Sequence, residues 1–317
     1  MTPPISPPIQ PKMPGPKDAA QITAELTGQA VSSIRRFKTG NANFVYHATL
    51  ADGSAVVTRM TRPDLRPVAD AAAGWNRRLR ELGVPLPDLL VSDLDGPFPT
   101  LLLEHLPGTD LGACVGQMTT GQLDKLIEQL IQMHRLVHDL PTAGRFGFAA
   151  CADQAPHASW FAVLDALVTR INPALSAEKS ELHTALIKLE GQISQIQPTP
   201  FLHDTTTKNV LIGQDGRLVG IVDVDDLCWG DPRFVIALTH VGMALADGPD
   251  DYADKWLHRA GYADDAPYRL SIALHALAIK GEILANSNQN GLDNAANPKE
   301  IDCLTRLFQH SLSTLPL

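Results

Sequence analysis

Cysteine is scarce in this sequence, and its placement suggests neither a disulfide framework nor a metal site. The 317 residues include only Cys114, Cys151, Cys228 and Cys303, which lie far apart and form no CxxC pair. Clustered cysteines are what a zinc site or a small disulfide-linked fold requires. Reduced thiols are the simplest interpretation, so we expect a cytoplasmic protein.

Long apolar runs are also absent. No run approaches the roughly 18 residues that a membrane-spanning helix needs, so we expect no membrane partner. The N-terminal segment MTPPISPPIQPKMPGPK has proline where a signal peptide would have an apolar core. Its composition predicts a disordered, Pro-rich tail over residues 1–17.

An excess of basic residues is missing as well. The chain has 26 Lys and Arg against 35 Asp and Glu, for a net charge of -9. A nucleic-acid-binding protein would show a basic face, so that class of partner is excluded. The acidic balance is compatible with a small-molecule partner that is cationic. With 44% hydrophobic residues, the chain can build one large domain or two lobes.

What is present begins with strand-forming patterns near the N-terminus. A short helix is expected over residues 18–29, followed by the runs SSIRRFK, FVYHATL and SAVVTRM, which are typical of strands. The ADG between the last two predicts a hairpin turn. A helix is predicted over residues 68–83, where four apolar side chains share one face: Ala72, Trp75, Leu79 and Leu82. TLLLEHLPG then reads as a buried strand that leads into a connector.

The rest of the chain is mainly helical in pattern. In TTGQLDKLIEQLIQMHRLVHDL one face carries Leu123, Ile127, Leu130, His134 and Val137, and we expect His134 to be a hydrogen-bonded core residue. Six further helices are predicted: 158–171, 176–196, 233–246, 251–260, 267–286 and 299–312. The order predicts an α+β fold of two lobes: a small antiparallel-sheet lobe over 18–106 and a larger, mainly helical lobe over 107–317.

One stretch interrupts the helices with polar clusters: FLHDTTTKNVLIGQDGRLVGIVDVDDLCWGDP, residues 201–232. VLIG and LVGIVDV around QDGR predict a β-hairpin. Because the ends of a hairpin lie together, Asp223 should return close to Asn209, on the same loop as Asp204. A carboxylate and an amide oxygen are ligands that Mg²⁺ accepts, and a second carboxylate can take a proton from a hydroxyl. These are the parts of a phosphoryl-transfer site. The three threonines 205–207 are expected to cap the loop's own backbone.

The stretch resembles the catalytic segment of the aminoglycoside phosphotransferase and choline kinase family, which is similar in fold to the protein kinases. The family pattern is H-x-D-x-x-x-x-N, then I-D-x-x-D, then G-D-P. Asp204 and Asn209 match the first part, Val222, Asp223 and Asp226 the second, and Gly230, Asp231 and Pro232 the third. TGNANFVYHATL, the ADG turn and VVTRM match the family's N-terminal region. The resemblance covers about residues 25–285.

The resemblance implies a small-molecule kinase that uses ATP and Mg²⁺. Asp204 would act as the base toward the acceptor hydroxyl, and Asn209 and Asp223 would ligate Mg²⁺. The nucleotide would be held by residues of the N-terminal lobe and the connector: Arg59, Gly40, Asn41, Asn43, Glu104 and Leu106. Relatives phosphorylate aminoglycosides, amino alcohols or sugars, so the resemblance leaves the acceptor open. It also leaves open whether GTP can be the phosphoryl donor, and whether the oligomeric state is a monomer or a weak dimer.

Two departures from the family pattern keep other hypotheses open. Leu202 stands where the family has a His that braces the loop, and His203 is one position later. The Glu expected to pair with Arg59 would fall near Ala72, where Asp70 is the closest acid. A pseudokinase that binds nucleotide or a protein partner without turnover is therefore one alternative. A metal-dependent phosphohydrolase, built on the carboxylates of 223, 225 and 226, is the other.

Overall fold

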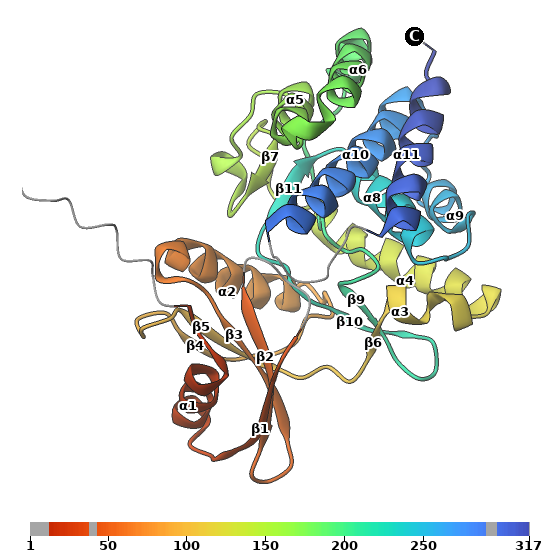
Figure 1. Ribbon diagram of the computed structural model, residues 1–317. Helices are drawn as coiled ribbons and strands as arrows, with labels where there is room; N and C mark the ends of the chain where they lie inside the picture. Colours follow the sequence, from red (N-terminus) through yellow and green to blue (C-terminus); the bar gives the residue numbers. More distant parts are fainter. Residues whose placement is uncertain (1–12, 38–42, 290–296, 317) are drawn as a thin grey trace, which may run out of the picture. The chain divides into compact units, whose positions relative to one another are not determined.

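The computed structural model describes residues 13–37, 43–289 and 297–316 (Figure 1). The chain divides into two compact units. The first unit runs to Arg78 and includes Pro87–Leu106, and the second comprises Leu79–Leu86 and Pro107–Leu317. Most of the expected tail lies outside the described residues, and the first helix already begins at Pro16.

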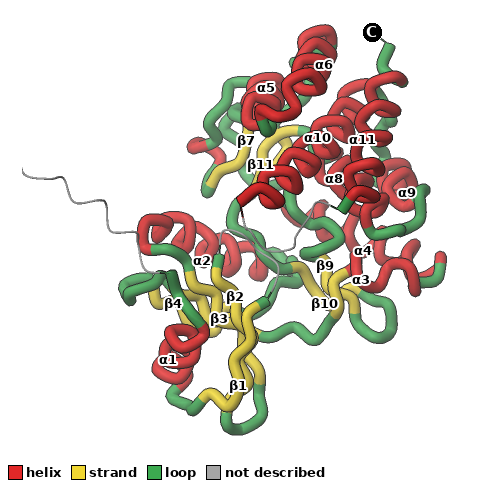
Figure 2. The backbone as a smooth tube through the Cα atoms, in the orientation of Figure 1, coloured by secondary structure: helices red, strands yellow, loops and turns green. Residues whose placement is uncertain are grey.

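The first unit is built on a five-stranded antiparallel sheet, in the order β1-β2-β3-β5-β4 (Figure 2). Its strands are β1 (Val31–Arg36), β2 (Phe44–Leu50), β3 (Ala55–Met60), β4 (Leu89–Asp93) and β5 (Thr100–Glu104). Two helices accompany the sheet: α1 (Pro16–Thr27) and α2 (Arg66–Glu81), with a 3₁₀ turn at Pro63–Leu65 before α2. The three predicted N-terminal strands, the TLLLE strand and both helices are confirmed, whereas the sequence pattern missed β4.

The sheet has two apolar faces because side chains alternate along each strand. One face packs against α1 in a cluster that includes Ile22, Phe44 and Met60. The other face packs Leu101 against Ala72 and Ala73 of α2. Leu82 does not join this helix face: it follows the end of α2 and is 37% exposed, so its prediction was wrong.

The second unit is mainly helical (Figure 1). Its helices are α3 (Leu111–Cys114), α4 (Thr120–His138), α5 (Trp160–Arg170), α6 (Ser176–Lys188), α7 (Glu190–Ile193), α8 (Arg233–Leu245), α9 (Tyr252–Arg259), α10 (Ala266–Gln289) and α11 (Pro298–Ser313). The predicted helix over 176–196 is divided at Leu189 into α6 and α7. In α4, all five residues of the predicted apolar face are buried, His134 among them.

Two small antiparallel sheets frame the polar stretch of the second unit. One has the order β10-β9-β6 and contains the predicted hairpin. The other has the order β7-β11-β8 and was not predicted. Their strands are β6 (Thr109–Asp110), β7 (Gly147–Ala149), β8 (Thr199–Phe201), β9 (Val210–Ile212), β10 (Leu218–Ile221) and β11 (Leu227–Gly230). In the described parts of the chain, no helix is long and apolar enough to cross a membrane.

Candidate functional site

The predicted site residues fall into two groups, and each group belongs to one unit. Asp204, Asn209 and Asp223 lie in the second unit, in the segments that join β8 to β9 and β10 to β11. Asn43, Arg59, Glu104 and Leu106 belong to the first unit. Gly40 and Asn41 lie outside the described residues.

The loop after β8 is a tight turn held by its own hydrogen bonds. The main-chain N–H groups of Asn209 and Val210 both donate to the carbonyl oxygen of Thr206, each at 3.1 Å. The Asn209 side chain donates from Nδ2 to the carbonyl oxygen of Asp204 at 3.0 Å. This bond occupies the amide nitrogen, so the atom that Asn209 can offer to a cation is Oδ1.

The hairpin brings Asp223 back to this loop, as the sequence predicted. The N–H of Val222 donates to the carbonyl oxygen of Asn209 at 2.9 Å. Asp223 follows directly and has φ of 62°, in the left-handed region that few non-glycine residues adopt. Aspartate tolerates this conformation better than most residues. The residue that returns to the loop is therefore one that suits the left-handed backbone at this position.

The carboxyl group of Asp204 is hard to ionise in this environment. Asp204 is exposed to solvent on one side, but partial desolvation by the surrounding protein and, second, the neighbouring Asp223 carboxylate raise its pKa to about 6. Hydrogen bonds from Asn209 and Thr206 and the charge of Lys208 act in the opposite direction. A carboxyl with a pKa close to neutral is suited to accept a proton from a hydroxyl and to release it again.

Two more acids and a histidine border the site, and their arrangement could not be seen in the sequence. Burial raises the pKa of Asp226 to about 7, with Asp225 and Asp204 adding to the effect. His203 Nδ1 lies 3.5 Å from Asp226 Oδ1, and burial lowers the pKa of His203 to about 4. At a pH between these two pKa values, His203 is deprotonated and Asp226 is protonated, so both groups are neutral. Their contact is therefore not an ion pair at mildly acidic pH. The ring of His203 packs edge-on against Phe148, 4.8 Å between centroids.

The three threonines of the loop are structural. All three are buried, and Thr205 donates from Oγ1 to the carbonyl oxygen of Leu202 at 3.2 Å. Thr207 accepts from the N–H of Gly112 at 2.9 Å through its main-chain oxygen. It also lies close to Gly242 of α8, where an added Cβ would come within 3.0 Å of the Thr207 hydroxyl. The loop is thus anchored by its neighbours as well as by its own turns.

The donor set at Asn209 and Asp223 fits magnesium better than a metal that is held by protein alone. Among the residues that the structure describes, no group of three or more His, Cys, Asp and Glu side chains could hold a metal ion. Mg²⁺ commonly takes one or two carboxylates and fills its remaining positions with water and substrate phosphates. One carboxylate and one amide oxygen beside an open loop meet that requirement.

In the first unit, Arg59 is buried in β3 and is held by an amide. It is 6% exposed, so it is not the solvated strand residue that its charge alone would suggest. With the amide of Asn43 turned so that its oxygen faces the guanidinium, this oxygen accepts from Arg59 Nε at 3.2 Å and from Nη2. The amide nitrogen then donates to Thr61 at 3.0 Å. Asp70, the closest acid in the sequence pattern, is exposed on α2.

The connector residues follow the last strand of the sheet in the first unit. Glu104 is tied to Asp88 twice: its N–H donates to the Asp88 carbonyl at 2.8 Å, and its Oε2 accepts from the Asp88 N–H at 3.1 Å. β5 ends at Glu104, so His105 and Leu106 are the first residues of the connector after the sheet. The His105 ring stacks edge-on against His47 of β2, 4.6 Å between centroids.

Asp231 of the G-D-P segment supports the fold. It is 4% exposed, and its carboxylate accepts from the N–H and the guanidinium of Arg233. Arg233 in turn reaches Asp265 at 2.7 Å. This network fixes the start of α8.

A unit with a small antiparallel sheet and a mainly helical unit with an Asp-x-x-x-x-Asn loop beside a hairpin define a kinase-like fold. Residues 33–271 match the phosphotransferase enzyme family known as APH, and the chain belongs to this family. Among curated proteins, none matches the sequence significantly.

Solved structures are similar in fold over nearly the whole chain. A thermostable mutant of aminoglycoside phosphotransferase APH(4)-Ia, in its apo form, has a TM-score of 0.70 at 14% identity, covering 93% of this chain and 98% of its own. An aminoglycoside phosphotransferase in complex with GDP and kanamycin has a TM-score of 0.65 at 14% sequence identity, and the match covers 92% of this chain and 98% of its own. LicA in complex with AMP has a TM-score of 0.65 at 12% sequence identity, and the match covers 94% of this chain and 98% of its own.

Proposed function

We propose that this protein is a small-molecule kinase that transfers the γ-phosphoryl group of ATP to a hydroxyl of a small acceptor. One observation carries the proposal: Asp204, with its pKa raised to about 6, lies on the loop whose Asn209 meets Asp223 at the end of the hairpin. Family membership supports the reaction class. The residue roles below are proposals.

Asp204 would orient the acceptor hydroxyl and take its proton as the oxygen attacks phosphorus. The elevated pKa makes this carboxylate a better proton acceptor than an aspartate with the ordinary pKa. Its main-chain carbonyl accepts a bond from the Asn209 side chain, so the backbone that carries the carboxylate is already ordered before the acceptor arrives. Such fixed positioning lowers the barrier of a bimolecular transfer.

Asn209 and Asp223 would hold Mg²⁺ against the nucleotide phosphates. Bound there, the metal would neutralise charge on the phosphate oxygens as the transfer proceeds. The bond from the Val222 N–H to the Asn209 carbonyl places Asp223 beside Asn209, and the bond to Asp204 uses only the amide nitrogen of Asn209, not its oxygen.

Arg59 would bind phosphate oxygens from the first unit. A guanidinium can hold two phosphate oxygens at once, and Asn43 keeps it oriented in β3. Glu104 and Leu106 belong to the connector, and main-chain groups of this segment would recognise the base. One relative in fold is a GDP complex and another an AMP complex, which supports nucleotide binding without choosing between ATP and GTP.

The acceptor would be a small alcohol of the aminoglycoside, amino alcohol or sugar type. A structure similar in fold contains kanamycin, which supports an acceptor of this size. The net charge of -9 favours a cationic acceptor over an anionic one.

The test begins with calorimetric titration of ATP and of GTP, with and without Mg²⁺, on the wild type and on Asp223→Asn and Arg59→Ala. The proposal expects magnesium-dependent binding that Asp223→Asn makes independent of magnesium. Arg59→Ala should weaken binding about 10- to 100-fold, the scale of a lost charge-assisted pair. Arg217→Ala, in the exposed hairpin turn, is the matched control and should bind as the wild type does. If neither nucleotide binds, the kinase proposal is wrong.

An acceptor screen with Asp204→Asn then separates the alternatives. A kinase gives a phosphorylated acceptor, and the variant loses turnover by about 10²- to 10⁴-fold while still binding nucleotide. A pseudokinase binds nucleotide but forms no product with any acceptor, so wild type and variant do not differ. A phosphohydrolase releases phosphate at the same rate whether or not an acceptor is present.

A further inference from the structure

A histidine far away in the sequence contacts the loop that carries Asp204. His134, on α4, places its Nε2 2.8 Å from Thr205 Oγ1. Both side chains are buried, at 6% and 1% exposed. Thr205 is the residue directly after Asp204, so this contact reaches the loop at the peptide next to the proposed base.

The direction of the hydrogen bonds follows from the number of protons available. The Thr205 hydroxyl has one proton, and it donates to the carbonyl oxygen of Leu202 at 3.2 Å. His134 must therefore donate from Nε2, which requires the tautomer with the proton on that nitrogen. Burial lowers the pKa of His134 to about 3, so the ring is neutral at physiological pH and can keep this tautomer. The result is a chain of two bonds, from His134 through the Thr205 hydroxyl to Leu202.

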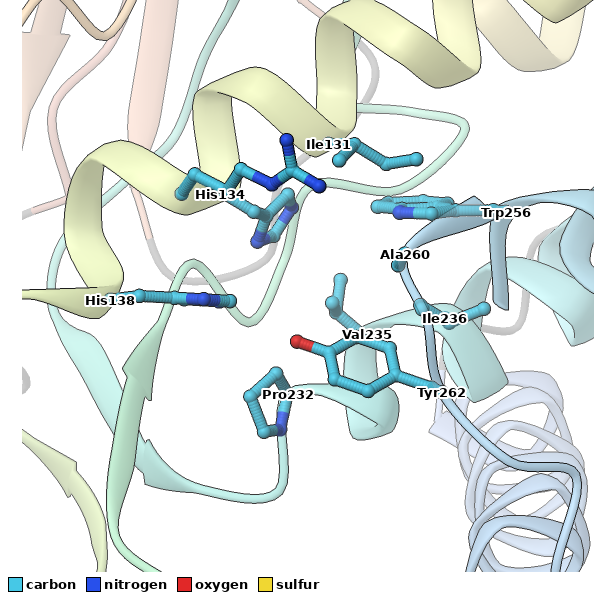
Figure 3. A pocket seen from close by; sticks show the side chains of 10 residues that line it. Ile131, His134, His138, Pro232, Val235, Ile236, Trp256, Ala260 and Tyr262 are labelled. Atoms are coloured by element: carbon cyan, nitrogen blue, oxygen red, sulfur yellow. The ribbon is translucent and has the colours of Figure 1, made fainter. Parts of the chain in front are cut away.

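The histidine ring is itself held in place. α4 begins with a capping box at Thr119 and Gln122, and the ring lies 5.5 Å from that of Trp256 between centroids. Its remaining side faces a cavity of about 80 Å³, which also borders His138 and Tyr262 (Figure 3). A rigid helix and a packed aromatic ring thus fix the donor atom before it meets the loop.

We infer that His134 is a positioning residue, which acts through the hydroxyl of Thr205 to fix the peptide that carries Asp204. The inference rests on the proposed kinase function, in which the place of Asp204 matters. Leu202 is buried and apolar, so its side chain cannot support the loop by hydrogen bonding. The bonds from His134 to Thr205 and on to Leu202 O hold the turn on both sides of His203 and Asp204.

The test compares variants that remove one atom group at a time. Thr205→Val keeps the shape but removes the hydroxyl, Thr205→Ser keeps the hydroxyl, and His134→Phe keeps a ring without a donor. The control is Thr239→Val in α8, because Thr239 is also 1% exposed and bonds a carbonyl oxygen, at 2.9 Å. This control measures the effect of removing a buried hydroxyl that is not bonded to a histidine.

The first readout is the split between kcat and KM. Thr205→Val and His134→Phe should lower kcat about 10- to 100-fold, the scale of a displaced reacting group, with KM for nucleotide little changed. Thr205→Ser and the Thr239→Val control should retain the wild-type kcat. The double variant Thr205→Val with His134→Phe should have a kcat no lower than that of the slower single variant, because both substitutions break the same hydrogen bond.

The second readout needs no turnover. The amide hydrogens of Asn209 and Val210 are bonded to the Thr206 oxygen. Their exchange with solvent should be faster in Thr205→Val and His134→Phe than in the wild type. It should be as slow as in the wild type in Thr205→Ser and Thr239→Val. Equal kcat and equal exchange in all variants would overturn the inference while an active wild type leaves the kinase proposal intact. A wild type without activity on any acceptor would overturn the kinase proposal, and exchange would still decide whether His134 fixes the loop.

Discussion

The main-chain N–H of Val222 donates a hydrogen bond of 2.9 Å to the carbonyl oxygen of Asn209. This bond continues the β9–β10 pairing by one step beyond the last strand residue, Ile221. It places the residue that follows, Asp223, beside the loop that carries Asp204, and this neighbour is the second cause, after desolvation, of the raised pKa of Asp204. Two acidic segments of the sequence therefore meet because a hairpin closes between them.

The left-handed backbone at Asp223 leads to a prediction about stability. Replacement of Asp223 by Gly, Asn or Ala removes the carboxylate in every case. Gly has no Cβ and Asn has a short polar side chain, so both tolerate a φ of 62°, whereas Ala has a Cβ and no polar group. We expect Asp223→Ala to be less stable than Asp223→Gly by about 1 kcal/mol, with Asp223→Asn close to Gly. Chemical denaturation of the three variants measures this order.

Asp247 provides the control for that experiment. It also has a positive φ, of 50°, but it is exposed and lies outside the candidate site. The same order of Gly, Asn and Ala is expected there. If Ala were the most stable residue at 223 and the least stable at 247, the backbone at Asp223 would not be left-handed in solution.

The pKa of Asp204 predicts how the rate depends on pH. A base must be ionised, so kcat/KM should fall as pH drops through about 6. Turnover at pH 5 should be about tenfold below the plateau at pH 8, because one pH unit below the pKa leaves about a tenth of the group ionised. An acid limb near pH 4 would mean that the pKa of Asp204 is not raised or that another group controls the rate.

Much of the fold could be predicted because its signals are local. The strands β1 to β3, the ADG turn and the face of α4 depend on alternation or on helical spacing within a short window. β4, β7 and β11 were missed because short strands are defined by their partners. β11 pairs with both β7 and β8, which lie far away in the sequence, and nothing in LCWG alone indicates this.

The candidate site divides in the same way. Asp204, Asn209 and Asp223 were predicted to lie together since one hairpin connects them, and the structure places them so. The link between His134 and Thr205 spans 71 residues, and the amide of Asn43 reaches Arg59 across paired strands. Contacts of this kind depend on tertiary packing, and the spacing of residues in one sequence contains no sign of them.

Asp226 leads to a prediction about stability and pH. Its pKa is raised from 3.8 to about 7 in the folded protein, so the folded state binds the proton more tightly than the unfolded chain. This contribution to stability is fully present below about pH 4 and is lost as pH rises through 7. Asp226→Asn, which cannot ionise, should therefore be more stable than the wild type at pH 8.

We expect the gain to be about 1 kcal/mol, because a third of the Asp226 side chain is exposed and water screens its charge. At pH 4 the two proteins should have similar free energies of unfolding. The measurement is denaturant unfolding at both pH values, with Asp215→Asn in the exposed hairpin turn as the control that should show no such difference. A gain at pH 4 that equals the gain at pH 8 would show that charge is not its cause.

Gly230 and Trp160 approach so closely that no other residue fits at position 230. A Cβ added to Gly230 would lie 2.2 Å from atoms of the buried Trp160 ring, far inside van der Waals contact. Gly230→Ala should therefore destabilise the protein by about 1 to 3 kcal/mol, the usual cost of overpacking a core. Gly121→Ala in α4 is the matched control, because nothing lies within 4 Å of its added Cβ and no loss is expected.

A double-mutant cycle assigns the loss to this contact. Trp160→Leu is destabilising by itself because it leaves a cavity, but it removes the ring that the new methyl group would meet. Gly230→Ala should then cost less in the Trp160→Leu background than in the wild type, with a coupling of at least about 0.5 kcal/mol. If the cost is the same in both backgrounds, the glycine is required for the backbone of β11 and the ring is irrelevant. Thermal unfolding of the four proteins decides between the two.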